Sequence, residues 1–276
     1  MPLQDADKAI WNVLMRLRLR NEGAAPNPAA YIGDLPIDAV GLEETALAFI
    51  DYCRSAERRA ASRPLFSTSV NGQVVSLCAL DRGVAELFRS ADSINADGQP
   101  IVALSRLLSR TPLPERVATT DLFPVVARLA AKSDVTFYLF GGTEAVNRAA
   151  AENAQTAYPG LRIVGRRSGY FSPSEEPAIA EEIARLAPDI LWLGLGVPFE
   201  QQFCARNLDK LRGVGVVKTS GGLFDFLALA KPRAPLWMQR LGFEWLFRML
   251  AEPRRLALRY LLTNPHALFV LARDLK

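Results

Sequence analysis

The sequence predicts an α/β fold in which a Rossmann-like, mostly parallel sheet carries helices on both faces and is followed by a C-terminal helical appendage. Apolar runs of strand length alternate with stretches of helical periodicity through most of the chain. These runs are continuously apolar, which is typical of strands buried on both faces of a parallel sheet. Half of the 276 residues are hydrophobic, which is enough to form a large core and excludes a disordered chain.

The expected elements follow one another in order along the chain. Strands are expected at the short apolar runs 31–37, 64–70, 134–142, 161–165, 189–196 and 213–222. Helices are expected where apolar residues recur every three or four positions, at 42–53, 74–80, 143–155, 178–187 and 199–211. One more short apolar run ends at Asp97 and Gly98, before what reads as the start of a helix.

The two ends of the chain differ from this body, so we expect three segments, at 1–28, 29–233 and 234–276. The first is predicted to be an amphipathic helix, with Ile10, Trp11 and Leu14 on one face, followed by a linker. The second is the Rossmann-like body. The third is wholly helical in pattern, with helices that each begin near a proline, at 235–250, 252–262 and 264–275.

The charge is concentrated at the C-terminal end. Residues 231–276 contain nine Lys and Arg against three Asp and Glu, a local excess of +6 in a chain whose net charge is +4. Such a basic, apolar segment predicts an anionic partner, which would be a phosphate, a nucleic acid or a membrane surface. A solvated helical face explains the same charges. Neither end resembles a nucleic-acid-binding module, so we expect no nucleic-acid partner.

The cysteines and the apolar runs predict a cytoplasmic protein. Cys53, Cys78 and Cys204 are widely separated, without the close pairs of a zinc site or the density of a disulfide scaffold. The first twenty residues lack the uncharged core of a signal peptide, and charges interrupt every later apolar run before about 18 residues. We therefore expect a chain that neither spans a membrane nor is exported.

Ligands of such sheets bind beyond the carboxyl ends of the strands, so the strand-to-helix junctions are the candidate sites. Gly141, Gly142 and Thr143 precede a helix whose first turn offers free N–H groups, as an anion or nucleotide site requires. Other junctions carry glycine, hydroxyl, amide or carboxylate groups, at Thr68, Ser69, Asn71, Asp97, Gly194, Gly196, Gly221, Gly222 and Asp225. Helix capping or turn formation is the alternative interpretation of each polar residue.

Several chemistries find no support in the sequence. Phe199 stands where the dinucleotide-binding fingerprint requires its third glycine. The only histidine, His266, lies near the C-terminal end without partners in sequence for a triad or a metal site. The only D-x-D pattern, at Asp5 and Asp7, lies ahead of the predicted sheet. We therefore expect no metal and no other cofactor.

Eight motifs between about Tyr31 and Tyr260 together resemble the WecG/TagA/CpsF family of glycosyltransferases. In order they read STSVNGQVV, ADGQPIV, RVATTDLFP, FYLFGG, GLGVPFEQQF, GGLFDF, RAP and GFEWLFRMLAEPRRLALRY. The resemblance implies an enzyme that moves a sugar from a UDP-sugar to a lipid-linked diphosphate saccharide, with inversion and without a metal. It also implies a peripheral protein on the inner face of the bacterial cytoplasmic membrane, active in envelope or exopolysaccharide synthesis, with a homo-oligomer among its expected assemblies.

The resemblance also implies roles for individual residues. Asp97 would be the general base, and an unperturbed aspartate, with a pKa near ~3.9, would be ionised at neutral pH. Ser69 or Thr68, with Asn71, would orient the sugars. UDP would be held by Gly141, Gly142, Thr143, Gly221 and Gly222, with Glu200, Gln201 and Asp225 as candidates for the base or ribose. Guanidinium groups suit the acceptor diphosphate and the membrane, at Arg233, Arg248, Arg254, Arg255 and Arg259.

The chain departs from the family pattern at several positions, and two other functions compete. Glu200 and Gln201 exchange the amide and carboxylate of the family's P-x-Q-E segment, while Thr119 and Leu229 stand where glycines are common. One rival is another nucleotide-using α/β enzyme, such as a dehydrogenase or methyltransferase. The other is a non-catalytic scaffold recruited to membranes. The transferred sugar stays open between N-acetylmannosamine, its uronic acid and glucose.

Overall fold

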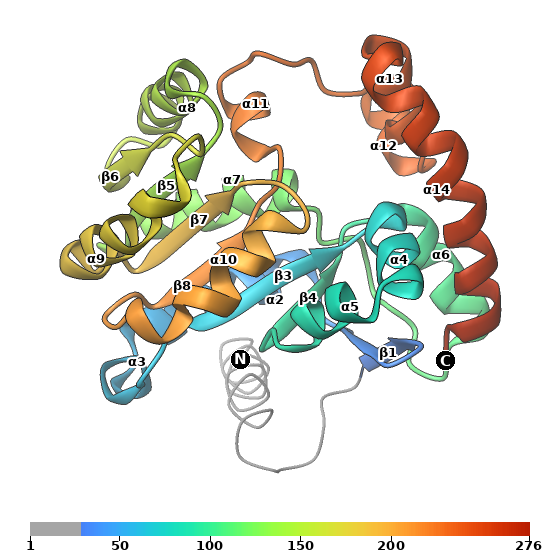
Figure 1. Ribbon diagram of the computed structural model, residues 1–276, viewed down its shortest axis with the longest axis horizontal. Coiled ribbons are helices and arrows are strands. Elements are labelled where there is room, and N and C mark those ends of the chain that lie inside the picture. Colours follow the sequence, from blue (N-terminus) through green and yellow to red (C-terminus); the bar gives the residue numbers. More distant parts are fainter. Residues whose placement is uncertain (1–28) are drawn as a thin grey trace, which may run out of the picture.

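The computed structural model describes residues 29–276 and shows the predicted α/β architecture (Figure 1). The predicted amphipathic helix within 1–28 lies outside these residues. Six strands form one sheet in the order β4-β3-β8-β7-β5-β6, and every neighbouring pair is parallel. Their bounds are β3 Leu65–Val70, β4 Ser93–Ala96, β5 Thr136–Gly141, β6 Arg162–Arg167, β7 Ile190–Gly194 and β8 Val216–Thr219. The fold class is therefore confirmed.

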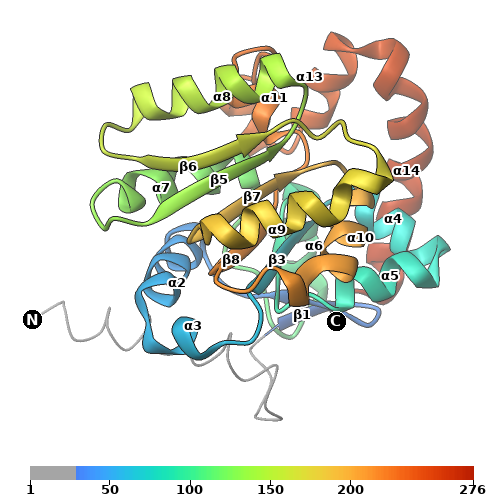
Figure 2. The same cartoon turned by 60° about the vertical axis from the view of Figure 1, so that its left-hand side comes forward.

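Helices cover both faces of the sheet, as Figure 2 shows. One apolar cluster joins the sheet to α4 (Gly72–Leu80), α5 (Arg82–Arg89), α6 (Gln99–Leu108), α9 (Glu176–Leu186) and α10 (Phe199–Asn207). The other joins it to α2 (Leu42–Arg54), α7 (Thr119–Ala130), α8 (Glu144–Ala157) and α11 (Leu223–Leu227). Short helices α3 (Ala56–Ala60), η1 (Pro173–Glu175) and η2 (Leu208–Lys210) complete the body. Phe137 and Trp192 pack edge-to-face in the second cluster, 5.8 Å between ring centroids.

The predicted strand at 31–37 is wrong in form, because the chain folds there into a hairpin. β1 (Ala29–Ile32) pairs antiparallel with β2 (Leu35–Asp38), with Ile32 opposite Leu35. The two residues between them are Gly33 and Asp34, and Gly33 has a φ of +60°. Glycine adopts this conformation without the steric penalty of a Cβ, so the tight turn interrupts the apolar run.

The helices at the C-terminal end are real, but two of their predicted boundaries are wrong. The stretch 235–250 contains α12 (Leu236–Arg240) and α13 (Glu244–Ala251), which are separated at Gly242 with a φ of +80°. The last two predicted helices form one helix, α14 (Pro253–Asp274), which continues through Pro265. A proline inside a helix removes one hydrogen bond, and tertiary packing offsets that loss here. His266 Nδ1 and Ser76 Oγ on α4 lie 2.8 Å apart beside the proline.

The last helix shares the core of the body. Ala267, Val270, Leu271 and Leu275 are buried in the same cluster as α4 and α5. The backbone N–H groups of Tyr31 and Lys276 each donate to the other residue's carbonyl, at 2.9 and 2.8 Å. In Figure 1, α14 runs alongside α4, with the C-terminus beside β1. Within residues 29–276, no helix has both the length and the apolar character needed to span a membrane.

Candidate active site

Asp97 lies directly beyond the carboxyl end of β4, beside the end of β3. Its backbone N–H donates to Val70 O at 2.8 Å. The backbone N–H of Val117 donates to Ala96 O, also at 2.8 Å, so the segment before α7 returns along the end of β4. This pairing brings Arg116 close enough for its charge to act on Asp97. Asp97 and the charged groups around it, here called the Asp97 cluster, therefore lie at the carboxyl ends of the strands, where open α/β sheets bind their ligands.

The surroundings of Asp97 change its titration. Removal of water by the surrounding protein raises the pKa of Asp97 to about 7. The cations of Arg116, Lys218 and Arg248 act in the opposite direction, while Glu244 raises the pKa further. The expectation of full ionisation at neutral pH, drawn from the unperturbed value, is therefore wrong. A pKa near the working pH favours general base catalysis, because it combines a useful ionised fraction with a useful proton affinity.

Arg116 belongs to a ring of alternating charges that joins α7 to α13. Its Nη2 lies 2.7 Å from Asp121 Oδ2, and its Nη1 lies 2.8 Å from Glu244 Oε2. Arg233 contacts the same two carboxylates, at 2.6 Å from Asp121 Oδ1 and 3.7 Å from Glu244 Oε1. These pairs hold α13 against the body, and α13 also carries Arg248. Two of the predicted acceptor-binding arginines, Arg233 and Arg248, therefore lie in or beside the Asp97 cluster.

The structure distinguishes the two hydroxyl groups at the end of β3. Thr68 is fully buried, and its Oγ1 accepts from Gln201 Nε2 at 3.1 Å and lies 2.8 Å from Thr219 Oγ1. Ser69 is partly exposed, and its Oγ lies 3.4 Å from Thr119 Oγ1 at the start of α7. Alternate residues of a strand point to opposite faces, so only Ser69 shares the face of α7 with the Asp97 cluster. Asn71 caps α4, accepting from Val74 N at 3.2 Å.

Glycines bring the ends of β5, β7 and β8 together with little space between them. Gly141 has a φ of +145°, and a Cβ there would overlap the carbonyl of Gly194. A Cβ on Gly194 would lie 2.8 Å from Gly221 O. These strand ends thus meet backbone to backbone. The predicted glycines Gly141 and Gly221 lie together at this edge, and a ligand there would meet main-chain groups.

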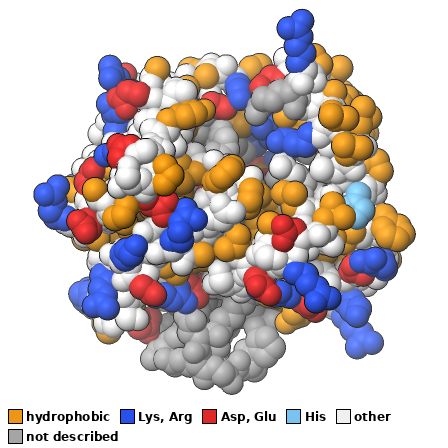
Figure 3. All heavy atoms as spheres, viewed as in Figure 1, with side chains coloured by type: hydrophobic (Ala, Val, Ile, Leu, Met, Phe, Trp, Pro, Cys, Tyr) orange, Lys and Arg blue, Asp and Glu red, His pale blue; other side chains and the backbone are white. Residues whose placement is uncertain are grey.

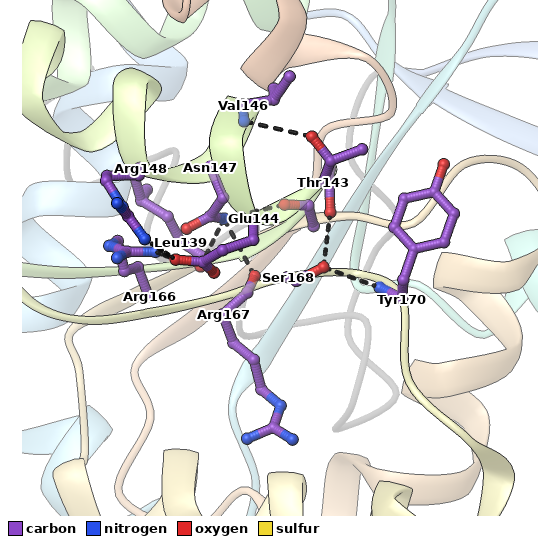
Figure 4. Close-up of polar contacts among 12 residues, drawn as sticks. Leu139, Thr143, Glu144, Val146, Asn147, Arg148, Arg166, Arg167, Ser168 and Tyr170 are labelled. Carbon is purple, nitrogen blue, oxygen red and sulfur yellow. Dashed lines mark hydrogen bonds and ion pairs between the residues drawn. The ribbon is translucent and has the colours of Figure 1, made fainter.

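The loop after β5 is held rigidly, as Figure 4 shows. Asn147 Nδ2 donates to the carbonyls of Leu139, Gly141 and Arg167, at 3.1, 2.9 and 3.0 Å. Thr143 caps α8 by accepting from Val146 N at 3.2 Å. The carbonyl of Gly142 accepts from Ser168 Oγ at 3.1 Å. The loop is therefore preorganised before any ligand arrives.

Glu200 and Gln201 are both buried at the start of α10, where sequence reasoning placed nucleotide contacts. Glu200 Oε2 accepts from the backbone N–H of Gly221 at 3.0 Å and of Gly196 at 3.3 Å. An internal carboxylate thus occupies the Gly221 donor that we expected to face UDP. Burial raises the pKa of Glu200 to about 7, against the opposing effect of these hydrogen bonds and of Lys218. Asp225 pairs with Lys231 at 2.6 Å.

Glu200→Gln is expected to change how stability depends on pH. A carboxyl group whose pKa is raised by folding stabilises the fold at pH values below its unfolded-state pKa, which is ~4.3 for glutamate. That contribution is lost as the pH rises through the folded-state pKa of about 7. Glutamine does not titrate, so the melting temperature of the variant should rise relative to wild type over this range, by the equivalent of about 1–3 kcal/mol at pH 8. Thermal melts between pH 5 and 8 measure this. Exposed Glu152→Gln is the control, and parallel curves for Glu200→Gln and wild type would refute the expectation.

The remaining predicted arginines lie farther along the C-terminal helices. Arg248 lies over the Phe226 ring at 5.5 Å, and Arg259 over the Tyr260 ring at 4.9 Å. Arg254 is exposed on α14. The side chain of Arg255 lies outside the described part of the structure. In residues 29–276, no group of three or more His, Cys, Asp or Glu side chains is placed to hold a metal ion.

Sequence reasoning missed Arg116 and Lys218 as site residues. Arg116 lies within a quoted motif, RVATTDLFP, but its partners come from residues distant in the sequence. Lys218 is fully buried in β8. A lysine inside the apolar run 213–222 was the available signal, because lysine is almost never fully buried without a compensating partner.

Comparisons with known proteins identify the family that the chain resembles. A sequence model described as "Glycosyl transferase WecG/TagA/CpsF family" matches residues 30–276. A protein of Bacillus subtilis (strain 168) is 30% identical over 226 residues, which cover 82% of this chain and 86% of that protein. A protein of Staphylococcus aureus (strain MRSA252) is 25% identical over 223 residues, covering 80% and 86%. Both are named N-acetylglucosaminyldiphosphoundecaprenol N-acetyl-beta-D-mannosaminyltransferase.

Proposed function

Because the chain belongs to the WecG/TagA/CpsF family of glycosyltransferases, we propose that it transfers a sugar from a UDP-sugar to a saccharide carried on a polyprenyl diphosphate. The transfer proceeds with inversion and without a metal, in the synthesis of a bacterial envelope polysaccharide. The names of the relatives support a lipid-linked acceptor. Family membership also decides against the dehydrogenase, methyltransferase and scaffold alternatives.

The observation that carries this proposal is the cluster of Asp97 with Arg116, Arg248 and Lys218 at the carboxyl ends of the strands. In an inverting transfer, the acceptor hydroxyl attacks the anomeric carbon from the face opposite UDP, and a base removes the hydroxyl proton. Asp97, with a pKa of about 7, suits that role. The guanidinium groups of Arg116 and Arg248 favour binding of an anionic acceptor diphosphate on the side of the base.

The C-terminal helices support contact with a lipid surface. Figure 3 shows hydrophobic side chains gathered along the right-hand edge of the molecule, over α13 and α14. Exposed apolar residues on these helices are Leu250, Leu258, Leu261, Leu262, Leu268 and Phe269. Together with exposed Arg254, they suit the boundary between anionic headgroups and acyl chains. We place the enzyme on the cytoplasmic face of the membrane, and homo-oligomers stay a prediction that light scattering checks.

The test is transfer by the purified full chain. UDP-N-acetylmannosamine, its uronic acid and UDP-glucose are each supplied with undecaprenyl-diphosphate N-acetylglucosamine, in detergent and in anionic vesicles, and the products are identified by mass spectrometry. We expect one donor to be used, faster in vesicles than in neutral detergent, with inverted configuration. Failure of all donors would reject the substrate assignment, and equal rates in both media would reject the membrane contact.

Removal of divalent cations is expected to leave transfer unchanged. The leaving UDP can instead be stabilised by the N-terminus of α8 after Thr143, which offers free N–H groups and the positive end of the helix dipole. Initial rates are compared before and after EDTA treatment, and after Mg²⁺ or Mn²⁺ is returned. Loss of transfer with EDTA and its recovery with either ion would refute the metal-free reaction.

A further inference from the structure

Lys218 is a fully buried lysine on β8, near the centre of the sheet, and β3 lies between it and β4. It lies on β8 opposite Ser67 of β3, and its side chain is shielded from solvent. Its three protons are shared among four oxygens, because Nζ lies 2.8 Å from Ser69 Oγ, 3.0 Å from Asn95 Oδ1, 3.2 Å from Thr68 O and 3.3 Å from Ser67 Oγ. All these acceptors belong to the two strands that end at the Asp97 cluster.

The ammonium group is held by neutral oxygens alone. Among the residues that the structure describes, no carboxylate lies within ion-pair distance of Lys218. Burial accordingly lowers the pKa of Lys218 to about 7, while the carboxylates of Asp97, Glu200 and Asp38 act at longer range to raise it. Burying a cation without a direct partner destabilises a fold, and an apolar side chain would fill the same space without that loss. The position thus points to a role beyond packing.

The N–H groups of the Lys218 ammonium determine which hydrogen bonds the neighbouring Ser69 and Asn95 side chains can make. An ammonium group only donates, so Ser69 Oγ accepts from it, and the hydroxyl proton of Ser69 is available to Thr119 Oγ1, 3.4 Å away, or to a substrate oxygen that replaces this long contact. Ser69 is the one partly exposed residue among the four partners. Asn95, held in the same way, lies two residues before Asp97 and opposite Ser69 in the sheet. Lys218 therefore fixes the ends of β3 and β4 relative to each other.

We propose that Lys218 is a positioning residue for glycosyl transfer: its ammonium group holds Ser69 Oγ and Asn95 Oδ1, so that the Ser69 hydroxyl donates to a substrate bound beside Asp97. The proposal rests on the proposed function. The charged groups that act on Asp97 are Arg116 from the loop before α7, Glu244 and Arg248 from α13, and Lys218 from β8.

The pH dependence follows from the two groups together. Transfer needs ionised Asp97 and protonated Lys218, and both have a pKa of about 7. The rate should therefore pass through a maximum near neutral pH, with limbs that belong to the coupled pair. Without the lysine charge, the acid limb should move to higher pH, because Lys218 lowers the pKa of Asp97. The alkaline limb that Lys218 contributes should disappear.

Two substitutions separate the charge from the hydrogen bonds. Lys218→Met removes both, so we expect kcat to fall at least about tenfold, the acid limb to shift upward, and the KM for the UDP-sugar to change little. Lys218→Gln keeps a donor, so it should retain more of kcat and still show the shifted limb. Ser67→Ala is the matched control, because it removes one partner of Lys218 on the same face without altering charge.

A titration of the Asp97 carboxyl carbon by ¹³C NMR, assigned with Asp97→Asn, gives a second measurement that needs no turnover. We expect its midpoint to rise in Lys218→Met and Lys218→Gln and to stay unchanged in Ser67→Ala. Wild-type kcat and an unmoved midpoint in both lysine variants would overturn the proposal while leaving the proposed function intact. A wild-type protein without transferase activity would instead refute the function, and the titration would still test the electrostatic part.

Discussion

Asp97→Asn is expected to lower kcat by about 10² or more while leaving UDP affinity close to that of wild type. Asparagine keeps the shape of the side chain and can serve in a turn, but it cannot accept the proton of the acceptor hydroxyl. Because burial raises the pKa of Asp97 to about 7, the ionised carboxylate destabilises the fold above that pH. The melting temperature of Asp97→Asn should therefore equal or exceed that of wild type at pH 8. Initial rates, UDP titration and thermal melts measure the three quantities.

The control is Asp81→Asn, which changes a capping carboxylate on α5 and should leave turnover unaltered. Asp97→Glu should retain part of the activity if the longer side chain still reaches the hydroxyl. Turnover of Asp97→Asn within about threefold of wild type would show that Asp97 is a turn residue. The base would then be sought at Glu244 or Glu200, the other carboxylates of the site.

The order of the parallel strands was predictable because the sheet is buried on both faces, whereas α5 and α7 were not among the expected helices. Runs such as 190–194 remain apolar throughout, and a parallel sheet covered by helices is the structure that buries them. The hairpin at residues 29–38 was missed because a two-residue turn at Gly33 leaves the apolar character of the run almost intact. The continuous helix α14 was missed because local rules give Pro265 a boundary role, whereas packing against α4 carries the helix past it.

Site residues were predictable where one short motif is enough to place them in the fold. Asp97 follows a strand and precedes a glycine, so its place at the sheet edge can be read from local sequence. Its pKa cannot, because the burial and the charges of Arg116, Glu244, Lys218 and Arg248 arise only when distant segments meet. Glu200 shows the same limit, since its hydrogen bonds to Gly196 and Gly221 join two junctions that sequence reasoning treated separately.

Arg116→Ala is expected to lower kcat/KM by about 10² and to reduce stability by about 3 kcal/mol. The side chain of Arg116 is only 14% exposed and forms ion pairs with both Asp121 and Glu244. When it is removed, Arg233 is the remaining cation in contact with these two carboxylates among the described residues. The repulsion between Glu244 and Asp97 is then less compensated, and the pKa of Asp97 should rise. A smaller fraction of the base is ionised at neutral pH, so the deficit in kcat/KM relative to wild type at the same pH should shrink at pH 8 to 9.

Arg116→Lys keeps the charge but cannot bond to two carboxylates in the fork geometry of a guanidinium group, so we expect an intermediate loss of activity. Arg148→Ala, which breaks an exposed pair with Glu144 on α8, is the matched control and should change neither turnover nor the pH profile. A rate deficit in Arg116→Ala that stays constant from pH 6 to 9 would show that the guanidinium acts on the substrate and not through Asp97. The pair between Arg116 and Glu244 holds α13, the helix that carries Arg248, against the body. Loss of this pair in Arg116→Ala should therefore loosen α13 and speed hydrogen exchange in residues 244–251. Loss of a direct substrate contact alone would leave that exchange rate unchanged.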